Sequence, residues 1–187
     1  MSPKVADPRI IAIALRASRI GYAVFAGPKE LLDCGTHATT HDNDGRDSVE
    51  GKRIVALFPT FLPDVVVVKA VPKKQRTLLH RSRNLRGLII RESALRGKPV
   101  VILKDKDVKE AFRIFQGPTK YDRARVIASA FPELHWRLPP RRKLWQSEPR
   151  AMLIFDAIAV GFAYWRHYGA QTPSSKKSSN KVFHTEP

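Results

Sequence analysis

Short apolar runs separated by turn residues fill the first part of the chain. Residues 9–15 read RIIAIAL, residues 20–26 read IGYAVFA, and residues 30–35 form a third run after a turn at residues 27–29. Runs of this length, with β-branched residues and bounded by glycine, proline or polar residues, are typical of strands. Because the connections between them are short, the pattern predicts an antiparallel meander of three strands.

The next part of the chain predicts a helix followed by a buried strand. Residues 48–58 have apolar positions that fit a short helix, and we expect Pro59 and Pro63 to end it. Residues 64–69 read DVVVVK. Four consecutive valines are typical of a strand that is buried on both faces, so this segment predicts a central strand of a covered sheet.

A long helix, a second buried strand and three further helices follow. Apolar residues at helical spacing predict a helix over residues 74–96, ended by Gly97. The remaining predicted elements are a strand at Val100–Leu103, a helix that ends at Phe115 and is capped by Asp105 or Asp107, a helix over residues 121–131, a basic loop over residues 132–146, and a last helix over residues 147–168 capped by Ser147.

This order of elements predicts a single α/β domain at residues 1–168. The domain contains a five-stranded mixed sheet, with three antiparallel strands followed by two parallel ones, and helices on both faces. Residues 169–187 are polar, basic and of low complexity, so they predict a disordered tail.

The composition narrows the class of protein. The chain of 187 residues is 43% hydrophobic and 27% charged, which are globular proportions and exclude global disorder. Uncharged apolar runs stay well below the roughly 18 residues of a membrane span, and the N-terminal residues lack the apolar segment of a secretory signal. Cys34 is the only cysteine, which excludes an internal disulfide and argues against a cysteine-based zinc site. We therefore expect a cytoplasmic protein with no membrane partner.

The charge balance points to the class of partner. Lysine and arginine together number 34 against 17 acidic residues, which gives a net charge of +17. Such an excess repels itself in the folded chain and favours a polyanionic partner, with nucleic acid as the first candidate.

Two short motifs lie next to predicted strands. The pair Gly21-Tyr22 follows the first strand, and the pair Pro63-Asp64 precedes VVVVKAV. These motifs resemble the first hairpin, at the same spacing, and the fourth strand of the RuvC-type Holliday junction resolvases, a family with the RNase H-like fold.

Two later motifs extend the resemblance in the same order. Residues 108–117 followed by Lys120 are similar to the family's V-K-x-x-x-x-G…K segment, and residues 155–163 are similar to its last helix with a D-A-x-A motif. The similarity covers residues 9–168, and residues 131–157 are most similar to a divergent bacterial branch of the family. The resemblance implies the RNase H-like fold.

The resemblance also implies a chemistry that the residues fit poorly. In this family, four carboxylates hold two divalent ions that clamp the attacking and leaving oxygens of a phosphodiester. The matching positions are Ala14, Lys69, Leu153 and Asp156, of which only Asp156 is acidic. The departure implies a degenerate active site, with Mg²⁺ as the cofactor if cleavage survives.

Two questions about this site stay open at the level of sequence. Lys69 either pairs with Asp156, because an unpaired buried charge is costly, or extends from the strand end to solvent. Other acids could rebuild the site, but Glu148 lies eight residues before Asp156 on the same predicted helix, about 12 Å along its axis. Asp105 and Asp107 are expected to act as helix caps instead.

Basic and aromatic residues form the candidate nucleic-acid-binding surface, because guanidinium groups contact phosphates and tryptophan stacks on bases. The candidates are Arg16, Arg19, Lys73, Lys74, Arg76, Arg83, Arg137, Arg141, Arg142, Lys143 and Trp136. For Trp136 and Trp145, the alternative is a role as core anchors that hold their loop to the domain.

The sequence leads to functions of different classes. The first is a nucleic-acid-binding protein of RuvC-like fold, impaired in catalysis, that binds branched or structured DNA. The alternative is an enzyme, a Mg²⁺-dependent structure-specific endodeoxyribonuclease that uses Asp156 and recruited acids. A third is a scaffold that assembles on RNA or protein. DNA is favoured over RNA as partner, and the resemblance implies a homodimer and, with DNA as ligand, association with the bacterial nucleoid.

Overall fold

The computed structural model describes residues 7–16, 19–38, 49–70, 76–143 and 145–169. Its centre is a five-stranded mixed sheet in the order β3-β2-β1-β4-β5. The strands are β1 (Ile10–Arg16), β2 (Arg19–Gly27), β3 (Glu30–Ala38), β4 (Val65–Lys69) and β5 (Val100–Leu103). The first three strands form the antiparallel meander, and β4 and β5 run parallel to β1. The predicted α/β architecture is confirmed.

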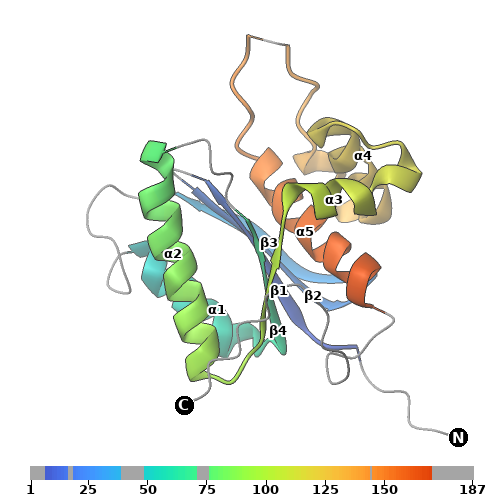
Figure 1. Ribbon diagram of the computed structural model, residues 1–187. Coiled ribbons are helices and arrows are strands. Elements are labelled where there is room, and N and C mark those ends of the chain that lie inside the picture. The colour runs from blue at the N-terminus through green and yellow to red at the C-terminus, as the bar shows by residue number, and fades with distance from the viewer. Residues whose placement is uncertain (1–6, 17–18, 39–48, 71–75, 144, 170–187) are drawn as a thin grey trace, which may run out of the picture.

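Helices cover both faces of the sheet (Figure 1). One face carries α1 (Val49–Phe61) and α2 (Arg76–Leu95). The other face carries α3 (Asp105–Ala111), α4 (Lys120–Ala130) and α5 (Met152–Tyr168), together with the short 3-10 helices η1 (Arg113–Phe115) and η2 (Pro132–Arg137). Among the described residues, no helix has the length and apolar character needed to cross a membrane.

The central strands are apolar throughout because both of their faces are covered. Along β4, Val65 and Val67 pack with the α3–α5 side, whereas Val66 and Val68 pack with the α1–α2 side. All four are at most 1% exposed. Burying each such side chain contributes about 1.5–3 kcal/mol. Strand β4 ends at Lys69, which by the same alternation points toward α5.

Helix α5 lies close to the sheet because glycines stand at its two tightest contacts. A Cβ atom at Gly161 would lie 2.9 Å from Cζ of Phe25, and one at Gly21 would lie 2.8 Å from Cγ of Leu153. Both distances are shorter than packed carbon atoms allow, so neither position tolerates a side chain without a shift of its neighbour. These contacts fix the first turns of α5 over the meander.

Two predicted helix boundaries are wrong. The last helix begins at Met152 and has Ala151 as its N-cap, not Ser147. Pro149 explains the difference, because the residue before a proline is disfavoured in the helical region, so a helix does not run back through Glu148. Helix α1 continues past Pro59 to Phe61, and the Thr60 hydroxyl donates to the Ala56 carbonyl at 2.7 Å in this last turn.

Smaller differences concern the segments between β5 and α5. The helix predicted to reach Phe115 is divided into α3 and η1, and the Asp107 carboxylate accepts a hydrogen bond from the Lys104 backbone N–H at 2.7 Å. Asp105 lies in the first turn of α3 and has other partners. The segment predicted as a basic loop contains η2. The tail predicted at residues 169–187 lies outside the described residues from residue 170 onward.

Candidate functional site

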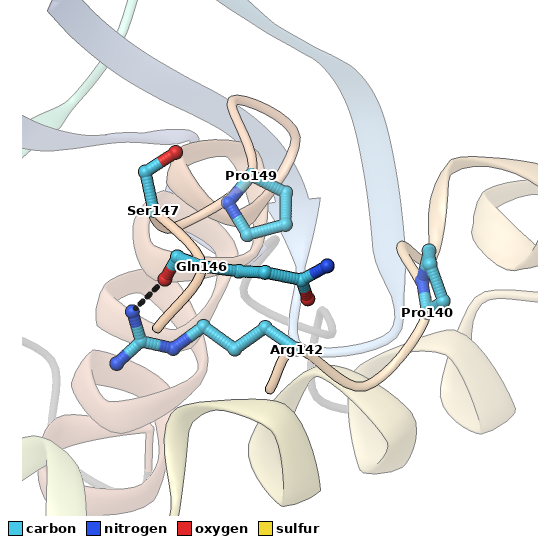
Figure 2. A pocket seen from close by; sticks show the side chains of 5 residues that line it. All are labelled: Pro140, Arg142, Gln146, Ser147 and Pro149. Atoms are coloured by element: carbon cyan, nitrogen blue, oxygen red, sulfur yellow. Dashed lines mark hydrogen bonds between the residues drawn. The ribbon is translucent and has the colours of Figure 1, made fainter. Parts of the chain in front are cut away.

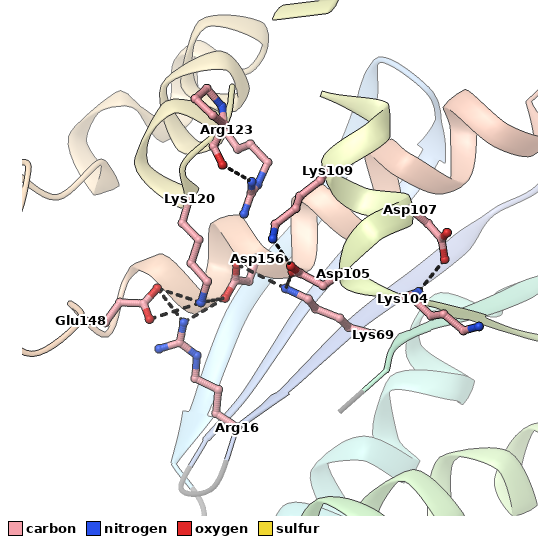
Figure 3. A network of polar contacts seen from close by, with 11 residues as sticks. Arg16, Lys69, Lys104, Asp105, Asp107, Lys109, Lys120, Arg123, Glu148 and Asp156 are labelled. Carbon is pink, nitrogen blue, oxygen red and sulfur yellow. Dashed lines mark hydrogen bonds and ion pairs between the residues drawn. The ribbon is translucent and has the colours of Figure 1, made fainter. Parts of the chain in front are cut away.

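Six charged side chains meet where β1 and β4 end and where α3, α4 and α5 begin (Figure 3). They come from five secondary-structure elements and from the segment before α5, and they carry three positive and three negative charges. We call this group the ion-pair cluster. Its members are Arg16, Lys69, Lys120, Asp105, Glu148 and Asp156.

Asp156 is the centre of the cluster. Its side chain is 9% exposed, and its Oδ2 atom lies 2.9 Å from Nη2 of Arg16 and 3.3 Å from Nζ of Lys120. Its Oδ1 atom lies 3.9 Å from Nζ of Lys69. Three cations from three different elements therefore surround one nearly buried carboxylate.

Glu148 is a second carboxylate of the cluster, and the sequence-based distance to Asp156 was wrong. Glu148 Oε1 lies 2.7 Å from Nη2 of Arg16 and 3.1 Å from Nζ of Lys120, the same two cations that bind Asp156. The expected separation along one helix does not apply because Glu148 precedes α5. The chain turns at Trp145 and Gln146, and the Glu148 carboxylate reaches the same two cations as Asp156.

Lys69 joins the cluster to α3. Its Nζ atom lies 3.2 Å from Oδ1 of Asp105, and Oδ2 of Asp105 lies 3.0 Å from Nζ of Lys109. The side chain of Lys69 is 16% exposed, so the interpretation in which it extends to solvent is wrong. The pairing with Asp156 is present at 3.9 Å, and Asp105 is the nearer partner.

The cluster holds its carboxylates in the charged form. Burial by itself raises the pKa of Asp156, but the positive charges of Lys69, Lys120 and Arg16 outweigh it, so the pKa is lowered. The pKa of Glu148 is lowered in the same way, with burial opposed by Arg16 and Lys120. For Asp105, burial is outweighed by Lys109 and Lys69, which lowers its pKa.

The two apolar residues at the implied metal-ligand positions lie beside the cluster. Ala14 is 2% exposed and pairs with Gly21 across the β1–β2 ladder, and Leu153 is 1% exposed and packs against Gly21. Lys69 follows Val68, which is the last valine of the parallel β1–β4 register opposite Ile13. The four positions that the resemblance singles out therefore converge on one place in the fold.

The side chains of the ion-pair cluster do not form a suitable site for a divalent metal ion. Among the residues that the structure describes, no group of three His, Cys, Asp or Glu side chains is arranged to hold a metal ion. Each carboxylate of the cluster contacts at least one ammonium or guanidinium group, and these cations occupy the space that a Mg²⁺ ion and its waters would need.

Some candidate nucleic-acid-binding residues are exposed to solvent, and others already contact partners within the protein. Arg83, Arg141, Arg142 and Lys143 are exposed, and Trp136 is 77% exposed. Arg16 is bound by two carboxylates in the ion-pair cluster, so its expected contact with phosphate stays a prediction.

The remaining candidates have other positions or are not described. Arg19 is half-buried, and Arg137 is half-buried with its guanidinium 3.3 Å from the Cys34 carbonyl oxygen. Lys73 and Lys74 lie outside the described residues, and only the backbone of Arg76 is described.

Both loop tryptophans lie at the surface. Trp145 is 78% exposed, and Trp136 is 77% exposed, so the interpretation of these residues as core anchors is wrong.

Sequence reasoning missed two cations of this site. Lys120 bridges Glu148 and Asp156, and Lys109 contacts Asp105. The signal for Lys120 was present in the resemblance, where it closes the segment that follows the second buried strand. No local pattern reveals Lys109, because its role depends on the packing of α3 against the end of β4.

Known structures share this arrangement of elements. No family model matches the sequence, and no functionally curated protein matches it. RuvC of Thermus thermophilus in complex with a Holliday junction substrate superposes with a TM-score of 0.67 and 17% identity over 94% of this chain and 99% of that one. Another Thermus thermophilus RuvC structure gives a TM-score of 0.64 at 17% identity, covering 85% of this chain and 94% of that chain. The yeast mitochondrial Holliday junction resolvase Ydc2 gives 0.58 at 13% identity, covering 89% of this chain and 82% of that chain. The chain therefore has the RuvC-like, RNase H-like fold.

Proposed function

We propose that this protein binds branched or structured DNA and does not cleave it. The observation that carries the proposal is the ion-pair cluster, in which Arg16, Lys69 and Lys120 neutralise the carboxylates where a nuclease of this fold would hold its metal ions. The carboxylates of a site closed in this way are not available to bind Mg²⁺, while the surface around the site keeps a strong positive charge.

The distribution of basic residues supports a nucleic-acid ligand. The net charge is +17. The first turn of α2 and the segment before α5 lie at the same end of the molecule, on opposite sides of the sheet (Figure 1). Exposed cations occur on both sides of the sheet, with Arg83 seven residues into α2 and Arg141, Arg142 and Lys143 in the segment before α5. Cations on both sides of one end suit a ligand with phosphates on two sides, such as two arms of a junction.

The solved structures support the same class of ligand. One of the similar structures is described as a complex with a Holliday junction substrate, and another is described as a Holliday junction resolvase. We therefore favour DNA over RNA, association with the nucleoid of a bacterial cytoplasm, and a homodimer that matches a two-fold junction.

One observation favours the alternative, a metal-dependent endonuclease. Asp105, Glu148 and Asp156 come from separate parts of the chain and meet in the ion-pair cluster. These are the acids that a rebuilt active site would recruit. The alternative requires Mg²⁺ to displace lysine and arginine side chains from all three carboxylates, which is why we place it second.

Binding should depend strongly on salt, because each phosphate contact releases condensed counterions. Replacing Arg141, Arg142 and Lys143 together by alanine should weaken binding to a labelled four-way junction and reduce the slope of log K against log salt by roughly 1–3. The measurement is fluorescence anisotropy at several salt concentrations with the junction, a duplex of equal length and an RNA hairpin.

The matched control removes the same charge elsewhere. Lys29, Arg113 and Arg166 are exposed and lie outside the two basic regions, so their triple alanine variant should keep most of the affinity. Equal losses in the two triple variants would mean that binding follows net charge alone. Absence of binding to every nucleic acid at low salt would refute the proposal.

A further inference from the structure

We propose that residues 136–143 and 145–149, which we call the tryptophan loop, bind unpaired bases, and that Trp136 and Trp145 stack on them. The inference rests on the proposed function and names the part of the nucleic acid that this surface recognises.

Both tryptophans of the loop are exposed to solvent. Trp136 and Trp145 are 77% and 78% exposed, whereas Trp165, the third tryptophan of the chain, is 8% exposed in the core. Tryptophan is highly buried on average in folded proteins, so two exposed rings in one loop indicate a binding surface. An aromatic ring that is kept at a basic surface is suited to stacking on a nucleobase.

A positively charged side chain lies over each of the two rings. The guanidinium carbon of Arg137 lies 4.7 Å from the ring centroid of Trp136, and Nζ of Lys143 lies 5.4 Å from that of Trp145. A cation over one face of the ring leaves the opposite face for a base and sits at a distance suited to that nucleotide's phosphate. The same pairing of a ring with a cation occurs twice in the loop.

An open depression lies between the two parts of the loop (Figure 2). Its volume is ≈ 480 Å³, and Pro140 and Pro149 line it together with Arg142, Gln146 and Ser147. Prolines offer flat apolar surface, and the guanidinium, amide and hydroxyl groups offer hydrogen bonds to base edges or phosphate. A nucleotide can approach such an open surface without displacing protein side chains.

The loop is held in shape before any ligand binds. Arg142 Nη1 donates to the Gln146 carbonyl at 2.9 Å, and the Lys143 backbone N–H donates to Oε1 of Gln146 at 2.9 Å. At the two ends, Arg137 contacts the Cys34 carbonyl of β3 and Glu148 is bound in the ion-pair cluster. An ordered loop loses little conformational freedom on binding, which favours affinity.

Unpaired bases are favoured over paired ones by geometry. In a duplex each base is stacked on both faces by its neighbours, so a tryptophan ring reaches a base face only in a single strand, at a strand end or at a junction centre. The tryptophan loop should therefore add affinity for nucleic acid with unpaired bases and add little for a blunt duplex.

The test compares a single strand of about 12 nucleotides, within the roughly 4–16 that one such site covers, with a blunt duplex of the same length. Binding to the full-length protein is measured by anisotropy at one salt concentration and by quenching of tryptophan fluorescence. The variants are Trp136→Ala and Trp145→Ala, the ring-preserving Trp136→Phe and Trp145→Phe, and Phe115→Ala as a control at an exposed aromatic side chain on η1, outside the loop.

Each tryptophan-to-alanine variant should lose roughly 5- to 150-fold in affinity for the single strand, the value of one stacked base. Affinity for the duplex should change by less than about 2-fold because the charge is unchanged. The phenylalanine variants should recover most of the loss, and the single strand should quench the fluorescence of the exposed tryptophans in the wild type.

The outcomes separate this inference from the proposed function. If the wild type binds both ligands, and the alanine variants weaken neither or weaken both equally, the inference is wrong and the proposed function stands. The same conclusion follows if the single strand binds without quenching. If the wild type binds no nucleic acid, both are wrong.

Discussion

Replacing Asp156 by alanine should lower the free energy of unfolding by about 3–5 kcal/mol, the usual cost of removing one partner from a buried group of ion pairs. The carboxylate is 9% exposed and faces Arg16, Lys69 and Lys120. Without it, three cations are left close together in a partly buried place with two carboxylates between them. Chemical denaturation of the variant and the wild type measures the difference.

The control for this variant is Glu110→Ala. Glu110 pairs with Arg113 on the surface, where both side chains are more than half exposed, so the same change of net charge should cost less than about 1 kcal/mol. Equal stability of the Asp156→Ala and Glu110→Ala variants would contradict the account of the cluster.

The cluster also predicts how stability depends on acid. The folded state lowers the pKa of Asp156, Glu148 and Asp105 through their cations. A lowered pKa contributes stability above the unfolded value, about 4, and that contribution is lost as the pH falls through the folded value. The difference in stability between the wild type and Asp156→Asn should therefore be constant above about pH 5 and shrink below about pH 4.

Replacing Gly21 by alanine should cost about 3 kcal/mol, near the upper end for overpacking in a core. The added Cβ would lie 2.8 Å from Cγ of Leu153 and would also overlap the Leu153 carbonyl oxygen. A backbone carbonyl in α5 does not move aside as a flexible side chain does. The helix must shift away from the meander, which also moves Asp156 relative to Arg16.

Gly87→Ala is the matched control for this prediction. Gly87 lies on α2, and a Cβ atom there meets nothing within 4 Å, so alanine should stabilise the helix by up to about 1 kcal/mol. The two variants are compared by thermal and denaturant unfolding. A Gly21→Ala variant that is as stable as the wild type would show that α5 is not seated against β2 in the way described.

The strands were predictable from sequence because their signals are local. Four valines in a row can be buried on both faces only in a central strand, and the structure places Val65–Lys69 between β1 and β5. The meander follows from turn residues and short connections. These features depend on neighbours along the chain, so no tertiary knowledge was needed.

The start of the last helix was missed because one local rule outweighed another. Ser147 has the character of a helix cap, but Pro149 prevents Glu148 from adopting the helical conformation, and the helix begins at Met152. This shift of the boundary determines where Glu148 lies. Because Glu148 precedes the helix, its carboxylate can reach Arg16 and Lys120.

The site itself was predictable in part. The positions of Lys69 and Asp156 at one place followed from the resemblance, and their contact is present. The contributions of Lys120, Lys109 and Asp105 depend on how α3 and α4 pack against α5, which is a tertiary property that no single segment encodes. The exposure of Trp136 and Trp145 was not predictable either, because an apolar ring in a loop is as often an anchor as a surface contact.

The most direct test of the central claim is to incubate the wild type with an end-labelled four-way junction, with and without Mg²⁺ or Mn²⁺, and to resolve the strands on a denaturing gel. Asp156→Asn is run in parallel below the melting temperature of both proteins. Because the cations of the ion-pair cluster occupy the place where the resemblance implies metal ions, we predict that the junction is bound equally well with and without metal and that every strand stays intact. Metal-dependent cleavage that Asp156→Asn abolishes would contradict the account, and would mean that Asp105, Glu148 and Asp156 exchange their cations for metal on the DNA.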